Sequence, residues 1–92
     1  MRQLIIIFEF QQSNLYKMDS FKNILRRYGK FAFITSNSCI IWTNDSEVTV
    51  RDNLRTQISF EDKIFVASIS SPAAWVTSLS QEVSDFLKQN LR

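Results

Sequence analysis

Apolar residues dominate the beginning of the chain. The run 4–8 is entirely apolar and rich in isoleucine, and Glu9 ends it. Such a run predicts a strand over residues 3–10. Its side chains make both faces apolar, with Leu4, Ile6 and Phe8 on one face and Ile5 and Ile7 on the other. Two apolar faces indicate a central strand that is covered on both sides. Because a buried charge is costly, the Glu9 carboxylate is expected at the rim of the sheet.

The hydrophobic pattern divides the rest of the chain into six further elements. Apolar residues three and four positions apart, beginning at Phe21, predict a first helix, and Gly29 suits the left-handed position after its end. Alternation at 30–35 predicts an edge strand, and a polar loop is expected at 11–17. The predicted elements are helices at 18–28, 47–57 and 81–91 and strands at 30–35, 39–43 and 62–69.

The order of these elements predicts the fold class. Strand, helix, strand, strand, helix, strand is the split βαβ, or ferredoxin-like, arrangement. We therefore expect an α+β, ferredoxin-like βαββαβ sandwich with a four-stranded antiparallel sheet. It would form a single domain, with a core at 1–70 and a C-terminal helical extension at 71–92. Right-handed crossovers place both main helices on one face and make the first and third strands central neighbours.

The second face of this sheet also needs a cover, because its central residues are large and apolar. An exposed patch of this kind marks an interaction surface, and a two-fold homodimer is the common solution. The interface would then include Ile5, Ile7, Phe65 and Trp75. The alternative is that the C-terminal segment, with Trp75, Leu79, Phe86 and Leu87, folds back over the sheet.

The composition limits the classes of catalytic chemistry that the chain can carry out. The chain has 92 residues, a net charge of +2, one cysteine and no histidine. Cys39 has no partner for an internal disulfide, so a cytoplasmic location is expected. The absence of histidine excludes Ser-His-Asp and Cys-His catalysis and the zinc proteases. No apolar run approaches the ~18 residues that would suggest a membrane span, and one glycine cannot make a Gly-rich phosphate loop.

Several segments resemble a known family. The opening LIIIFEF, followed by a polar loop and a helix, resembles the small ferredoxin-fold subunit of CRISPR adaptation complexes and its VapD-type toxin relatives. The second half is more similar to the stand-alone SinR-like branch. Its supporting segments are VRDNL at 50–54, KIFVA at 63–67, AAW at 73–75 and DFLKQNL at 85–91.

This resemblance implies a homodimer and a nucleic-acid context. In nuclease members, an aspartate at the end of strand one and its two-fold mate hold a divalent cation; in adaptation complexes the subunit is a DNA-binding scaffold. Here Glu9 stands at that position, one methylene longer, which moves the carboxylate by more than ~1 Å. Glu9 is therefore the candidate catalytic and Mg²⁺-binding residue, or else a solvated carboxylate at the rim. Ser13 and Tyr16, in the following loop, could assist phosphoryl chemistry or be surface residues.

Basic residues supply a candidate nucleic-acid surface. Lys22, Arg26 and Lys30 are four residues apart, with Arg27 beside them, and Arg51 and Arg55 repeat the spacing on the second helix. Such stripes contact phosphates or are solvated helix faces. The leading hypothesis is a homodimeric interaction module that binds nucleic acid or a protein partner without robust catalysis. The alternatives are a Mg²⁺-dependent endonuclease that uses Glu9 from both protomers, and an antitoxin or defence protein that acts by docking onto another protein.

Overall fold

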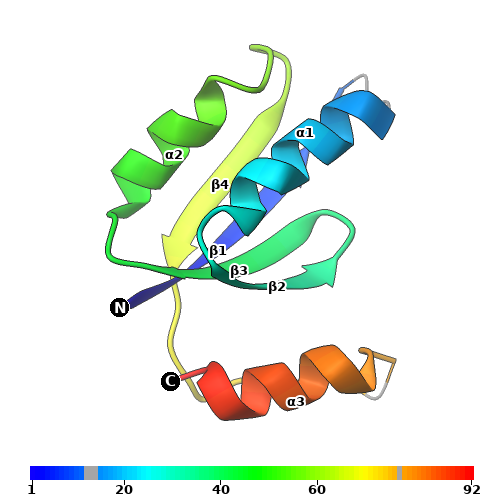
Figure 1. Cartoon of the computed structure of the whole chain (residues 1–92), viewed down its shortest axis with the longest axis vertical. Helices are drawn as coiled ribbons and strands as arrows, with labels where there is room; N and C mark the ends of the chain where they lie inside the picture. The colour runs from blue at the N-terminus through cyan, green and yellow to red at the C-terminus, as the bar shows by residue number, and fades with distance from the viewer. Residues whose placement is uncertain (12–14, 77) are drawn as a thin grey trace.

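The computed structural model has an α+β fold with one four-stranded antiparallel sheet and three helices, as predicted (Figure 1). It describes residues 1–11, 15–76 and 78–92. The elements are β1 (Arg2–Glu9), α1 (Leu15–Arg26), β2 (Lys30–Thr35), β3 (Ser38–Thr43), α2 (Glu47–Arg55), β4 (Lys63–Ser68) and α3 (Gln81–Asn90). None of the three helices in this described part has the length and apolar character needed to cross a membrane.

The strands lie in the order β2-β3-β1-β4, and all neighbours are antiparallel. The predictions that β1 and β3 are central neighbours and that β2 is an edge strand are thus confirmed. In the register, Ile7 lies opposite Phe65 and Glu9 opposite Lys63. Cross-strand partners share a face of the sheet, so the register also decides which side chains meet.

Both main helices cover one face of the sheet, as expected from right-handed crossovers (Figure 1). The core beneath them centres on Phe8 and Phe21, whose ring centroids are 4.7 Å apart. Leu25 of α1 and Leu54 of α2 are fully buried in the same cluster. Phe21 and Leu25 of α1 belong to the apolar stripe that the helical spacing predicted.

Several helix boundaries differ from the predictions. α1 begins at Leu15, so the predicted loop at 11–17 is wrong from Leu15 onward; residues 12–14 lie outside the described part. The same helix ends at Arg26 instead of Tyr28, because the next amides form tighter bonds three residues back and Gly29 takes φ +86°. α2 likewise ends at Arg55, two residues early. Apolar spacing continues through such closing turns, so periodicity alone overestimates helix length.

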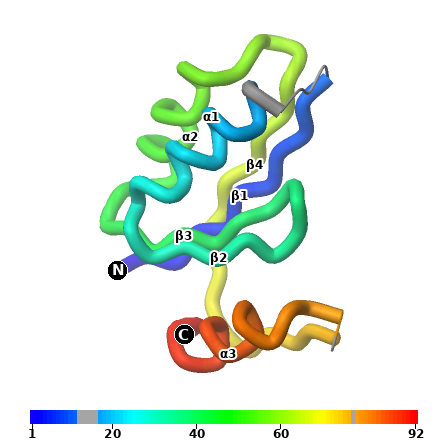
Figure 2. Tube along the Cα trace, turned by 45° about the vertical axis from the view of Figure 1, so that its right-hand side comes forward, coloured from blue at the N-terminus to red at the C-terminus, as the bar shows by residue number. Residues whose placement is uncertain are grey.

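α3 covers half of the opposite face of the sheet, over β2 and β3 (Figure 2). Leu87 packs with Ala32, Ile40 and Trp42, and the rings of Trp42 and Phe86 meet edge to face at 5.5 Å. Over β2 and β3, the C-terminal segment therefore folds back on the sheet, which was the alternative to a dimer.

The residues predicted at a dimer interface divide into two groups. Ile5 and Trp75 pack inside the chain against the α3 cluster. Trp75 also donates its indole N–H to Ser84 Oγ at 2.9 Å. Ile7 and Phe65, opposite each other on β1 and β4, remain 47% and 59% exposed. The uncovered apolar area is thus confined to the β1–β4 half of this face.

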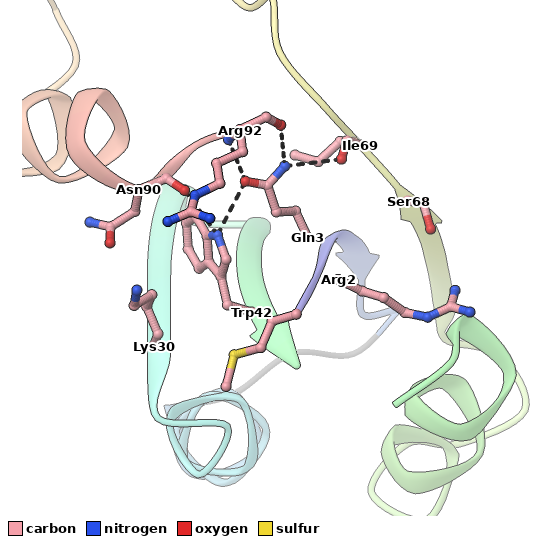
Figure 3. Close-up of a pocket in the computed structure, with 9 residues that line it drawn as sticks. Arg2, Gln3, Lys30, Trp42, Ser68, Ile69, Asn90 and Arg92 are labelled. Atoms are coloured by element: carbon pink, nitrogen blue, oxygen red, sulfur yellow. Dashed lines mark hydrogen bonds between the residues drawn. The ribbon is translucent and has the colours of Figure 1, made fainter. Parts of the chain in front are cut away.

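A buried amide ties the end of α3 to the centre of the sheet (Figure 3). Gln3 Oε1 accepts from Trp42 Nε1 at 3.3 Å and from the Arg92 amide. Its Nε2 donates to the carbonyls of Ile69 at 3.2 Å and of Arg92. The amide group is satisfied on both sides, which a buried polar group requires. The chain reaches α3 through a cis peptide between Ser71 and Pro72.

Candidate nucleic-acid interface

The most distinctive charged feature of the surface lies where α1 passes over edge strand β2. Lys22 Nζ is 5.3 Å and the Arg26 guanidinium carbon 5.5 Å from the centroid of one ring, Phe33. The spacing of four along α1 places both side chains on this side of the helix. Alternation along β2 places Phe33 on the face beneath them, where it packs against the main core. The ring gives each cation a fixed position through cation–π attraction.

The charges of this pair are not neutralised by carboxylates. Arg26 Nη1 donates to the neutral Asn23 Oδ1 at 2.9 Å. Within the described ranges, no carboxylate lies within ion-pair distance of Lys22 or Arg26. Two cations that share one ring repel each other, and an anion placed between them would relieve that repulsion. We call Lys22, Arg26 and Phe33 the α1 cation pair.

The remaining α1 candidates lie elsewhere. Lys30 is not on the predicted helical stripe, because α1 ends at Arg26 and the positive φ of Gly29 turns the chain into β2. Its side chain instead borders the cavity of about 430 Å³ drawn in Figure 3, on the far side of the sheet from the α1 cation pair. Arg27 borders a groove between α1 and α2, where Asn53 donates to the Tyr28 hydroxyl at 3.3 Å.

Arg51 and Arg55 lie at the other edge of the sheet. Both border a cleft beside β4, and β4 and β2 are opposite edges. Arg51 donates to Asp52 Oδ1 through two nitrogens, at 2.9 and 3.1 Å, and Arg55 lies 4.0 Å from the same oxygen. Arg51 and Arg55 therefore lie toward the opposite edge of the sheet from the α1 cation pair. Helices on the same face of a sheet can still present their charges toward opposite edges.

Glu9 lies at the end of β1, as predicted, with its side chain 68% exposed. Its Oε1 is 3.8 Å from Lys63 Nζ across the β1–β4 pair. Carboxylates are typical ligands of Mg²⁺, but the charged group paired with Glu9 across the two strands is an ammonium group. No group of three or more acidic, histidine or cysteine residues with metal-binding proximity occurs in the described part. The Mg²⁺ site shared by Glu9 of two protomers stays a prediction about two chains.

The other candidate reactive groups are the Cys39 thiol and the hydroxyls of Ser13 and Tyr16. Cys39 is fully buried in the main core. Burial raises the pKa of its thiol to about 12, against smaller opposing effects of the Ala32 backbone and of the nearby Arg26 and Lys22 charges. The thiolate needed for nucleophilic attack is therefore absent near neutral pH. Ser13 and the side chain of Tyr16 lie outside the described residues.

Sequence reasoning missed a buried carboxylate, Asp62, in the turn between α2 and β4. Its Oδ1 accepts from the Gln11 amide at 3.0 Å. Its Oδ2 accepts from the Ser59 amide at 2.9 Å and hydroxyl at 3.1 Å, and lies 2.5 Å from Lys17 Nζ. Burial alone would raise the pKa of Asp62, but these donors outweigh it and hold the pKa well below its usual range. The signal was the serine three residues before the aspartate, typical of a side-chain-closed turn.

The aromatic residues do not form a single base-stacking platform on the sheet. Phe31 and Phe33 lie under α1 on the main-core face. Trp42 lies under α3 on the other face, whereas Phe65 on that face is beyond the helix and exposed. Phe31, Phe33 and Trp42 are therefore core-packing residues, and Phe65 is not. Compared with models of known protein families and with curated proteins, the chain matches none.

Proposed function

We propose that this protein is a ferredoxin-like interaction module that binds nucleic acid through phosphate contacts at the α1 cation pair. The single observation that carries the proposal is that Lys22 and Arg26 share the Phe33 ring with no carboxylate partner in the described part. Element order and the strand order β2-β3-β1-β4 support the ferredoxin-like assignment. The resemblance to CRISPR-adaptation and SinR-like proteins favours the same context.

Phosphate is the anion that fits this pair best. A guanidinium presents a planar set of donors that suits phosphate oxygens, and an ammonium group adds a point charge beside it. The Phe33 ring holds both heads before any ligand arrives, so less side-chain entropy is lost on binding. Contacts of this type act on the backbone and carry no base sequence information. The expected ligand is therefore RNA or DNA bound without strong sequence preference.

The homodimer belongs to the same proposal. Ile7 and Phe65 leave an apolar strip on the β1–β4 half of the face that α3 does not cover. A second copy could cover this strip and bring the two phosphate-binding surfaces together. Light scattering on the purified chain measures the oligomeric state, and a strict monomer would remove this part of the proposal.

The test is a binding titration with a salt series. Fluorescently labelled single-stranded and duplex RNA and DNA of one sequence are titrated with protein, and anisotropy is measured at several salt concentrations. Replacing Lys22 and Arg26 by glutamine should reduce the slope of log K against log salt by about 1.8 for duplex DNA and about 1.4 for single strands. The affinity should fall together with the slope for every probe tested.

A matched variant removes the same charge from the other side of the molecule. Lys88→Gln with Arg92→Gln changes the net charge equally and should leave the slope unchanged. Equal losses in both double variants would mean that only net charge matters and would refute the site. If the native chain binds no probe, nucleic-acid binding fails and docking onto a protein, as in the antitoxin hypothesis, takes its place. Cleavage of the probes with Mg²⁺ that disappears in Glu9→Gln would establish the endonuclease alternative.

A further inference from the structure

A second surface feature, at the opposite edge of the sheet, combines an exposed aromatic ring with cations. Phe60 is 96% exposed at the tip of the turn between α2 and β4. It borders a cleft of about 570 Å³ together with Arg51 and Arg55 from α2 and Lys63 from β4. We propose that this cleft binds single-stranded nucleic acid, with a base stacked on Phe60 and the adjoining phosphates on the three cations.

The turn that carries Phe60 is held in a fixed conformation. Asp62 accepts both the amide and the hydroxyl of Ser59, and its own amide donates to the Ser59 carbonyl at 3.0 Å. The amide of Gln11 and the Lys17 ammonium complete the set of donors around the buried carboxylate. Phe60 is the residue that this closed turn directs into solvent. A ring carried into solvent by a fixed turn offers a stacking surface without the cost of ordering the backbone on binding.

The charges that border the cleft favour a polyanion. Arg51 and Arg55 share one exposed carboxylate, Asp52, and Lys63 is 3.8 Å from the exposed Glu9. Exposed ion pairs of this kind are weak and screened by salt, so phosphates can compete for these cations. The one carboxylate within the cleft lining, Asp62, is already paired with Lys17. The residues that line the cleft therefore carry a net positive charge.

An aromatic ring among cations selects single strands over duplexes. Bases in a duplex are stacked on each other and do not present a free face to a side chain. In a single strand every base offers such a face, so stacking tolerates any sequence while the cations hold the backbone. A protein partner would use the same ring as an interface anchor, but three cations around it fit phosphate better than a mixed protein surface.

The inference depends on the proposed nucleic-acid binding and adds a second site with its own ligand class. The test is Phe60→Ala in the full chain, titrated with labelled oligo(dT), oligo(U) and a duplex. Loss of one stacked base predicts about 5- to 150-fold weaker binding of the single strands. Duplex binding should stay within about twofold of native, because the α1 cation pair is intact. Phe60→Tyr, which keeps the ring, should restore most of the single-strand affinity.

Controls separate a binding role from a structural one. Phe60 makes little contact in the folded chain, so the urea midpoint of Phe60→Ala should equal that of the native protein. In Phe60→Trp, single strands should quench the emission of the new exposed indole, whereas duplex should not.

The outcomes distinguish the two proposals. Unchanged single-strand affinity in Phe60→Ala, or equal losses for single strands and duplex, overturns the Phe60 site and leaves the α1 cation pair standing. A normal salt slope in the Lys22 and Arg26 double variant together with a large Phe60 effect overturns the α1 pair instead. A native chain that binds no probe overturns both.

Discussion

Replacing Asp62 by asparagine should strongly destabilise the protein, although the two side chains have nearly the same shape. The carboxylate accepts the amides of Gln11 and Ser59 on different oxygens. Asparagine offers one oxygen and turns an NH₂ group toward the other donor, so at least one partly buried amide loses its acceptor. That loss costs about 1–3 kcal/mol. Loss of the partly exposed Lys17 ion pair adds about 1 kcal/mol.

The expected total is about 2–4 kcal/mol of unfolding free energy. A domain of this length is stable by roughly 5–14 kcal/mol, so the loss is a large fraction. It corresponds to a drop in Tm of roughly 10–30 °C. Urea unfolding followed by the fluorescence of Trp42 and Trp75 measures it, since both indoles lie in the α3 cluster.

The pH dependence gives an independent check on Asp62. The pKa of this group is lower in the folded chain than its unfolded value of about 3.9, so its stabilisation is fully present above that pH. The stabilisation is lost as pH falls toward the folded pKa, at about 1.4 kcal/mol per pH unit. The difference between native protein and Asp62→Asn should therefore be about 1 kcal/mol smaller near pH 3 than near pH 7.

The control for Asp62 is its neighbour Glu61, an exposed carboxylate in the same turn. Glu61→Gln removes the same charge but no buried acceptor, so its unfolding free energy should stay within about 0.5 kcal/mol of native. A loss below about 0.5 kcal/mol in Asp62→Asn at neutral pH, or one that does not change in acid, would refute the reasoning.

Two further predictions concern the α3 cluster and the single thiol. Leu87→Ala should lower the free energy of unfolding in urea by about 2–5 kcal/mol, because Leu87 is almost fully buried against Trp42. The control is Lys88→Ala, which changes an exposed residue and should be near neutral. Similar values for both variants would mean that α3 is not docked in solution. Cys39 should not react with a thiol reagent in the native protein near neutral pH and should react fully in denaturant, and rapid native labelling would contradict its burial.

Much of the fold was predictable because it depends on alternation and on helical spacing. β1 has two apolar faces and lies at the centre of the sheet, and β2 spans the residues that its alternating pattern predicted. Helix ends were less predictable, since apolar residues such as Tyr28 pack against the core from a closing turn. Hydrophobic patterning alone could not choose whether α3 or another chain covers the second face of the sheet.

The candidate site was predictable in its residues but not in its geometry. The spacing of Lys22 and Arg26 indicated a shared helix face, and they do share one. Their position over Phe33 depends on the packing angle of α1 against an edge strand, which no local pattern encodes. Lys30 shows the opposite case, because a single residue with positive φ, Gly29, sends it to the far side of the sheet.

The Gln3 amide makes the last segment of the chain inseparable from the first strand. If α3 lifted away, the Gln3 side chain would lose both of its hydrogen bonds to Arg92, and the Trp42 indole would lose its bond to the Asn90 carbonyl. Partial opening would therefore leave unmet polar groups at the heart of the sheet. The backbone amides of the C-terminal helix should then exchange with solvent only when the whole molecule unfolds, so that α3 behaves as part of one cooperative unit and not as an appended tail.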